Sequence, residues 1–128
     1  MSQIQLSPYI NFQGHAREAM EFYQQVLGGM LDLQPANDPG ARIQHARLEA
    51  EGIRLIAVDG HPAYPAQVGE NMALALSGTD HDRLTRIFQA LAEGGTIKMP
   101  LTAQPGGAAV GWLTDRFGIN WMVQIDQA

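Results

Sequence analysis

Two stretches of the chain carry apolar residues at the spacing of an amphipathic helix. From Ala16 to Leu27 these residues recur every three or four positions, and Gly28 follows directly. The stretch from Leu84 to Leu91 has the same period, and Gly94 follows it closely. A glycine just beyond a periodic run is a frequent helix end. We therefore predict two helices, each with one face packed on a sheet.

Other segments alternate apolar and polar residues with a period of two, which indicates strands. The alternation predicts strands within residues 4–12, 45–50, 53–58, 71–77 and 119–125. The side expected to face the helices carries Ile4, Leu6, Ile10, Phe12, Ala46, Leu48, Ala50, Ile53, Leu55, Ala57, Met72, Leu74, Leu76, Ile119, Trp121, Val123 and Ile125. The opposite side is too polar for a dry core.

The second half of the chain repeats the first at a shift of 66 residues. Without a gap, this shift pairs His15 with His81, Arg17 with Arg83, Phe22 with Phe88, Gly28-Gly29 with Gly94-Gly95, and Gly52-Ile53 with Gly118-Ile119. Each half, 1–62 and 67–128, reads as strand, helix and three strands. The predicted fold class is therefore α+β, with two βαβββ modules in tandem whose curved mixed sheets enclose a cavity.

The repeat also places individual side chains. His15 and His81 fall at corresponding helix starts and are expected to be exposed there. Thr79 followed by Asp82 resembles a capping box at the start of the second helix. At the same shift Trp112 matches Ala46 on the helix side of its strand, so we expect Trp112 to be buried.

The polar side of the sheets is the candidate ligand-binding surface. The residues expected to line a cavity there are Tyr9, Asn11, His45, Arg54, Asn71 and Met122. They come from different strands, and a concave pocket between curved sheets accounts for their mixed polarity. Arg54 or Arg47 would offer the positive charge for a small oxygenated or anionic molecule. We expect structural ion pairs between these arginines and Glu49 or Asp59.

Four strings of residues match one protein family in order and spacing. They are Ser7-Pro8-Tyr9-Ile10-Asn11-Phe12, Glu21-Phe22-Tyr23-Gln24-Gln25-Val26-Leu27-Gly28-Gly29, His45-Ala46, and Thr114-Asp115-Arg116-Phe117-Gly118-Ile119-Asn120-Trp121-Met122. Together they resemble the PhnB-like branch of the vicinal oxygen chelate superfamily, which includes glyoxalase I, extradiol dioxygenases and bleomycin-resistance proteins. The resemblance covers nearly the whole chain. It implies the tandem βαβββ fold and, because relatives cover their sheet edges by pairing two chains, a homodimer.

The same resemblance marks two places where relatives carry function. Metal enzymes of the superfamily take His and Glu ligands from the first and last strands of each half. The corresponding positions here are Gln5 and Ile56 in the first half and Asn71 and Met122 in the second, with Ser7, Pro8 and Tyr9 as the nearest substitutes. These side chains do not suit a divalent metal, so we expect no metal centre. Where the branch carries an aromatic loop with Phe-Trp-Gly, this chain has Gln104-Pro105-Gly106-Gly107, which implies a missing pocket wall.

Composition narrows the function classes further. A chain of 128 residues with 45% hydrophobic residues fits one domain, residues 1–128. Its net charge of −5 argues against nucleic acid and anionic membranes as partners. The absence of cysteine excludes disulfides, thiol catalysis and iron–sulfur clusters. No targeting segment or membrane span is readable, so a cytoplasmic protein is expected.

Two functions remain open from the sequence. The first is a module that binds a small organic molecule in its cavity without breaking a bond. The second is an isomerase or lyase of the glyoxalase and dioxygenase superfamily, with His45 as acid or base. Members of the branch are also described as ubiquinone-pathway methyltransferases, but the chain has no strand, Gly-rich loop and helix unit for a nucleotide-like cofactor. We therefore expect no cofactor.

Overall fold

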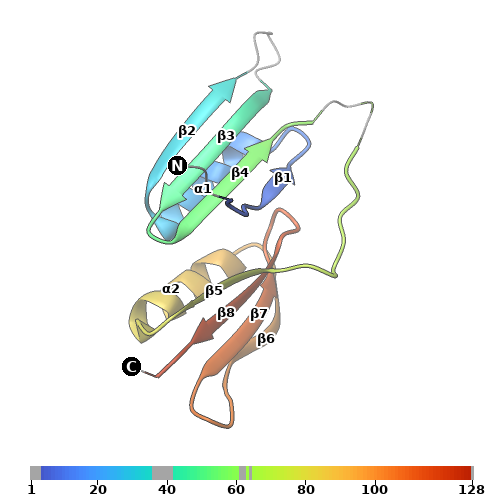
Figure 1. Cartoon of the computed structure of the whole chain (residues 1–128). Helices are drawn as coiled ribbons and strands as arrows, with labels where there is room; N and C mark the ends of the chain where they lie inside the picture. The colour runs from blue at the N-terminus through green and yellow to red at the C-terminus, as the bar shows by residue number, and fades with distance from the viewer. Residues whose placement is uncertain (1–3, 36–41, 61–62, 64, 128) are drawn as a thin grey trace. The chain divides into compact units, whose positions relative to one another are not determined.

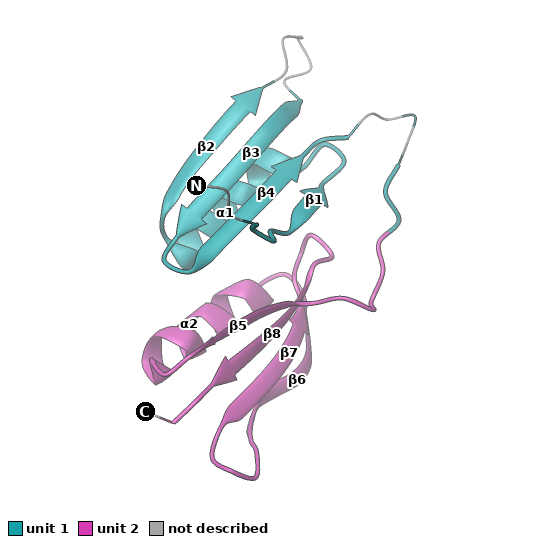
Figure 2. Cartoon of the chain, in the orientation of Figure 1, with its two compact units in different colours: residues 1–67 teal, residues 68–128 magenta. Residues whose placement is uncertain are grey.

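The computed structural model describes residues 4–35, 42–60, 63 and 65–127 (Figure 1). In chain order its elements are β1 (Tyr9–Asn11), α1 (Ala16–Leu27), β2 (Met30–Pro35), β3 (Ile43–Ala50), β4 (Ile53–Val58), β5 (Leu74–Gly78), α2 (His81–Ala92), β6 (Thr96–Ala103), β7 (Ala109–Thr114) and β8 (Asn120–Ile125). The chain divides into two compact units, Met1–Gln67 and Val68–Ala128, which we call unit 1 and unit 2 (Figure 2).

Each unit is a four-stranded mixed sheet with one helix packed on one face (Figure 1). The strand order is β1-β4-β3-β2 in unit 1 and β5-β8-β7-β6 in unit 2. In both sheets the first strand runs parallel to the fourth, and the other neighbours are antiparallel. The predicted α+β class and the two βαβββ modules in tandem are confirmed.

The core of each unit lies between its helix and the helix-facing side of its sheet. In unit 1, Met20 and Tyr23 of α1 are buried with Leu48 of β3. In unit 2, Phe88 of α2 is buried with Trp121 of β8. The predicted alternation is confirmed on these strands, because their other faces carry the more exposed residues. Each helix also ends where predicted, since Gly28 and Gly94 both take the positive φ that glycine adopts readily.

The first strand of each sheet is shorter than the alternation predicts. β1 begins only at Tyr9, so Ile4 and Leu6 are almost fully exposed instead of facing α1. Pro8 precedes the strand, and it has no N–H to extend the ladder, although its carbonyl still accepts from Ile56. In unit 2, Met72 lies before β5 and is also exposed, which corrects its predicted place against the helix.

The start of α2 differs from the expected capping box. Asp80, not Thr79, occupies the N-cap, and its carboxylate accepts a hydrogen bond from the backbone N–H of Arg83 at 3.1 Å. Aspartate is a stronger N-cap than threonine, which explains the choice. His15 and His81 are exposed at the two helix starts, as predicted. No described helix is long and apolar enough to span a membrane.

The two tryptophans have different surroundings, although both were expected in the core. Trp121 is 1% exposed, whereas Trp112 is 42% exposed. The cause is the hairpin between β7 and β8. Residues 115–119 lie between the paired Thr114 and Asn120, whereas only residues 50–53 lie between the equivalent pair in unit 1. The extra residue reduces the repeat shift on β7 from 66 to 65, and one step along a strand reverses the side that a residue faces.

Candidate functional site

A pocket of about 520 Å³ lies on the face of the unit 2 sheet that α2 leaves open. It is lined by Glu70, Asn71, Met72, Ala73, Ala75, Lys98, Trp112, Leu113, Thr114, Asn120 and Met122. Trp112 and Thr114 on β7 flank the buried Leu113, and Asn120 and Met122 on β8 flank the buried Trp121. The volume falls within the range of small-molecule sites, and the lining combines an apolar floor with a few polar groups.

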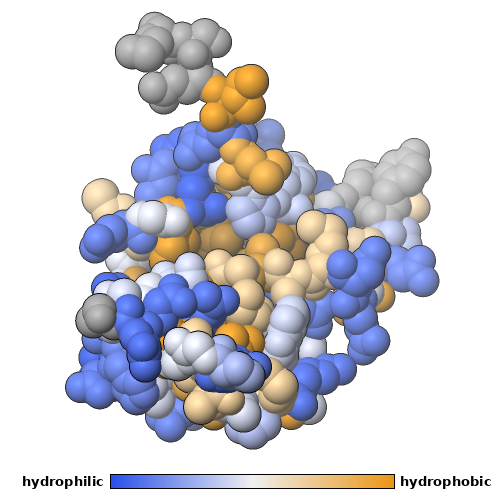
Figure 3. Space-filling model, turned by 60° about the horizontal axis from the view of Figure 1, so that its bottom comes forward, coloured by the Kyte–Doolittle hydropathy of each residue, from blue (hydrophilic) through white to orange (hydrophobic). Residues whose placement is uncertain are grey.

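Trp112 and Met122 form the aromatic and thioether part of this floor. They are directly paired across β7 and β8, so their side chains stand next to each other on the open face. Trp112 is among the large apolar residues that stay exposed in the described part of the chain. On the face of the molecule drawn in Figure 3, hydrophilic residues cover much of the surface and hydrophobic residues show in smaller groups. The indole N–H of Trp112 has no hydrogen-bond partner among the described residues. The ring therefore offers a stacking face and one free donor.

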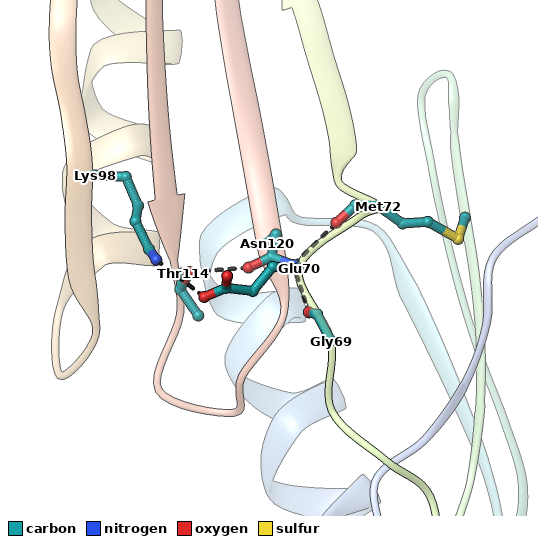
Figure 4. A network of polar contacts seen from close by, with 6 residues as sticks. All are labelled: Gly69, Glu70, Met72, Lys98, Thr114 and Asn120. Atoms are coloured by element: carbon teal, nitrogen blue, oxygen red, sulfur yellow. Dashed lines mark hydrogen bonds and ion pairs between the residues drawn. The ribbon is translucent and has the colours of Figure 1, made fainter.

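Asn120 organises the polar part of the pocket (Figure 4). Its amide nitrogen donates to the carbonyls of Gly69 and Met72, both at 2.9 Å. Its amide oxygen accepts from the hydroxyl of Thr114, also at 2.9 Å. Lys98 and Glu70 form an ion pair at 3.3 Å beside this network. Residues 69–72 are thus tied to the sheet and serve as one wall of the pocket.

The open face of the unit 1 sheet is chemically different. Glu49 lies 3.4 Å from the guanidinium of Arg47 and 3.7 Å from that of Arg54. Arg54 also donates to the side chain of Gln5, so the segment before β1 is tied to β4. These contacts confirm the predicted ion pairs of Glu49. The charged groups of this face are thus paired with one another at the surface, where such pairs are well solvated.

The six residues predicted to bind a ligand are divided between the units. Asn71 and Met122 line the pocket of unit 2. Tyr9, Asn11, His45 and Arg54 belong to unit 1 and are not among the residues that line it. The Asn11 side chain accepts hydrogen bonds from the backbone N–H groups of Gln13 and Gly60. His45 is half-buried on β3, and its imidazole makes no hydrogen bond or ion pair within the described part of the chain.

The sequence analysis did not place two of the lining residues, Trp112 and Asn120, in the candidate site. Trp112 was assigned to the core because the repeat was taken without a gap. The signal was present, since Arg116, Phe117 and Gly118 stand where unit 1 has only Glu51 and Gly52. Asn120 lay on the predicted open face, but its bonds to residues 69–72 depend on a segment without a strand pattern.

The C-terminal string of the family resemblance also has a structural explanation. The buried carboxylate of Asp115 accepts hydrogen bonds from the backbone N–H groups of Phe117 and Ile119 and from the indole N–H of Trp121 at 2.9 Å. It therefore holds the turn and orients the core tryptophan. Gly118 takes a φ of 85°, a value that favours glycine.

The residues present do not fit the metal of the superfamily's enzymes. Tyr9 pairs with Ile56 across β1 and β4, and the equivalent pair in unit 2 is Ala75 and Met122. Phenol, thioether and alkyl groups do not make a site for a hard divalent ion. Among the described residues, no three His, Asp or Glu side chains are grouped to hold one.

The helix starts do not fit a nucleotide-like cofactor either. Such a cofactor uses free backbone N–H groups at a helix N-terminus. The carboxylate of Asp59 already accepts from the N–H groups of Gly14 and Ala16 at the start of α1, at 2.7 and 2.9 Å. Asp80 occupies the same kind of position at α2.

Comparisons with known proteins agree with this fold. Residues 4–124 match the family model described as 3-demethylubiquinone-9 3-methyltransferase. Protein YjdN from Escherichia coli K12 is 27% identical over 139 residues, covering 94% of both chains. The crystal structure of protein PA1353 from Pseudomonas aeruginosa is 39% identical, covers 98% of this chain and 100% of its own, and superposes with a TM-score of 0.90.

More distant structures share the fold alone. A PhnB protein from Bacillus cereus is 23% identical with a TM-score of 0.81, over 95% of this chain and 99% of its own. A glyoxalase/bleomycin resistance protein from Albidiferax ferrireducens is 14% identical with a TM-score of 0.64, over 94% and 97%. The chain therefore belongs to the PhnB-like family whose model is described as 3-demethylubiquinone-9 3-methyltransferase.

Proposed function

We propose that this protein binds a small, flat, mainly apolar organic molecule with an oxygen acceptor, in the pocket on the open face of unit 2. The observation that carries the proposal is the exposed indole of Trp112 beside Met122 in a pocket of about 520 Å³. A flat ring stacked on an indole gains dispersion and quadrupole attraction of about 0.5–1.5 kcal/mol beyond the burial of its area. The free indole N–H provides a donor for the ligand's oxygen.

Charge complementarity at the pocket is limited. Lys98 is the cation of the lining, and it is paired with Glu70. The arginines that the sequence offered as partners for an anion lie in unit 1 and are paired with Glu49. These pairings support a neutral or weakly anionic ligand more than a strongly charged one.

Binding without turnover is the better supported of the two functions left open by the sequence. An isomerase or lyase mechanism requires a base held in position beside the reacting atom. His45 has no partner in the described chain that orients its imidazole. No specific observation therefore favours the enzymatic alternative, and we do not propose it.

The test uses the purified full chain. Small molecules released by denaturing the protein are identified by mass spectrometry, and 2-naphthol is titrated as a defined flat probe. We expect 2-naphthol to bind and to change the fluorescence of Trp112, and Trp112→Ala to weaken binding at least tenfold, with Trp112→Phe in between. Equal affinity in the wild type and Trp112→Ala would contradict the proposal.

A further inference from the structure

At the edge of the pocket, both the amide nitrogen and the amide oxygen of Asn120 are hydrogen-bonded within the protein. Its two N–H donors go to the carbonyls of Gly69 and Met72, and its oxygen accepts from Thr114. Figure 4 shows the amide between the wall segment and β7, with the three partners around it. Three polar groups, two of them in lining residues, are thus satisfied inside the protein.

Asn120 is also the main link between residues 69–72 and the sheet. This segment has no strand pairing of its own, since β5 begins at Leu74. The second link is the ion pair of Lys98 with Glu70, whose side chains are 50% and 83% exposed. An ion pair this exposed contributes little. The position of the wall therefore depends chiefly on one amide.

The equivalent position in unit 1 performs the same linking with different chemistry. Arg54 faces Glu49 across β3 and β4 as Asn120 faces Thr114 across β7 and β8. Arg54 bonds to Gln5, in the segment before β1. Both units thus tie the segment before their first strand from the same strand position, but only unit 2 does so with a neutral group beside an apolar floor.

We infer that Asn120 is the positioning residue that sets the ligand class of the pocket, an inference that rests on the proposed function. By occupying the carbonyls of Gly69 and Met72 and the hydroxyl of Thr114, it leaves stacking and apolar contact as the main source of affinity. It thereby selects flat ligands with few hydroxyl groups. Without it, the carbonyl of Met72 and the hydroxyl of Thr114, both in lining residues, become free to bond with polar groups on a ligand.

The experiment measures selectivity between two probes of the same ring system. Dissociation constants of 2-naphthol and 2,3-dihydroxynaphthalene are determined by calorimetry for the wild type, Asn120→Ala and Asn120→Thr. We expect Asn120→Ala to shift the ratio of the two constants five- to tenfold toward the diol, which corresponds to about one hydrogen bond. Asn120→Thr introduces one hydroxyl, which can bond to one of the three partners, so we expect a smaller shift. Arg54→Ala is the matched control and should leave the ratio unchanged.

A second measurement needs no ligand. Endoproteinase Glu-C cleaves after Glu70, which lies in the wall, and mass spectrometry locates each cut. We expect cleavage there to be several-fold faster in Asn120→Ala than in the wild type or Arg54→Ala, because the wall opens locally. Unchanged cleavage, or equal weakening of both probes without a change in their ratio, would overturn the inference. Failure of 2-naphthol to bind the wild type would instead contradict the proposed function.

Discussion

The two units share one strand order, but the open faces of their sheets carry different side chains. Ile56 pairs with Tyr9 and Arg47 in unit 1, and Met122 pairs with Ala75 and Trp112 in unit 2. At equivalent positions, the guanidinium of Arg47 in unit 1 is thus replaced by the indole of Trp112 in unit 2. The phenol of Tyr9 is replaced by the methyl group of Ala75. The comparison teaches that sheet register is retained while the open face changes freely, because those side chains do not support the core.

The close contacts that shape the backbone are also retained in both units. A Cβ on Gly29 would lie 2.3 Å from the carbonyl oxygen of Glu49, and one on Gly95 would lie 2.2 Å from that of Thr114. Both glycines follow the helix and let the next strand approach the hairpin. At these two close approaches the units agree, whereas on the open faces of the sheets they differ.

The largest expected effect separates the two tryptophans. Trp121→Ala removes a fully buried ring and should lower the free energy of unfolding by about 3–5 kcal/mol. Trp112→Ala removes a ring from the open face and should change it by less than about 1 kcal/mol. Urea unfolding followed by far-UV circular dichroism measures both. Similar losses in the two variants would contradict the assignment of Trp112 to the pocket.

The second prediction compares two carboxylates that each accept several hydrogen bonds within their own unit, Asp115 in unit 2 and Asp59 in unit 1. Asp115→Ala leaves two backbone N–H groups and the indole N–H of Trp121 without their acceptor, so a loss of about 3 kcal/mol in unfolding free energy is expected. Asp59→Ala frees the N–H groups of Gly14, Ala16 and Ile43. Because these groups are more accessible to water, we expect about 2 kcal/mol. Thermal unfolding of both variants beside the exposed control Asp82→Ala tests the order.

Much of the fold follows from the sequence, because its signals are local. The period of the helices, Gly28 as a stop and the alternation on β8 each depend on neighbouring residues and were confirmed. The first strands were predicted too long, because alternation at Ile4 and Leu6 says nothing about whether a partner strand is present. Pro8 was the physical signal for the limit of pairing.

The candidate site was harder to predict, since it depends on a single extra residue. An ungapped repeat places Trp112 toward the helix, and one additional residue in the hairpin turns it to the open face. Met122 and Asn71 were identified because β8 keeps the shift of 66 and because Asn71 lies near the start of β5. The bonds of Asn120 depend on irregular chain, for which a sequence pattern gives no register.

The third prediction concerns metal, which the described residues of neither unit are suited to hold. Adding Zn²⁺, Ni²⁺, Mn²⁺ or Fe²⁺ to protein treated with chelator should move the melting temperature by less than about 1 °C, because a ligand stabilises only the state that binds it. Differential scanning fluorimetry measures the shift, and elemental analysis of the purified protein gives the metal content. One tightly held equivalent, lost together with stability on chelation, would show that the ligand positions are wrongly assigned.

The smallest expected effect tests whether unit 1 takes part in binding. His45 was predicted from the sequence to contact a ligand, which would make His45→Ala weaken binding by about 1–3 kcal/mol. The pocket described in unit 2 does not include His45, so we expect 2-naphthol to bind His45→Ala as tightly as wild type. His81→Ala, exposed at the start of α2, is the surface control. Calorimetric titration compares the three proteins. A tenfold loss of affinity confined to His45→Ala would show that unit 1 takes part in binding. It would contradict the assignment of binding to the open face of unit 2 alone.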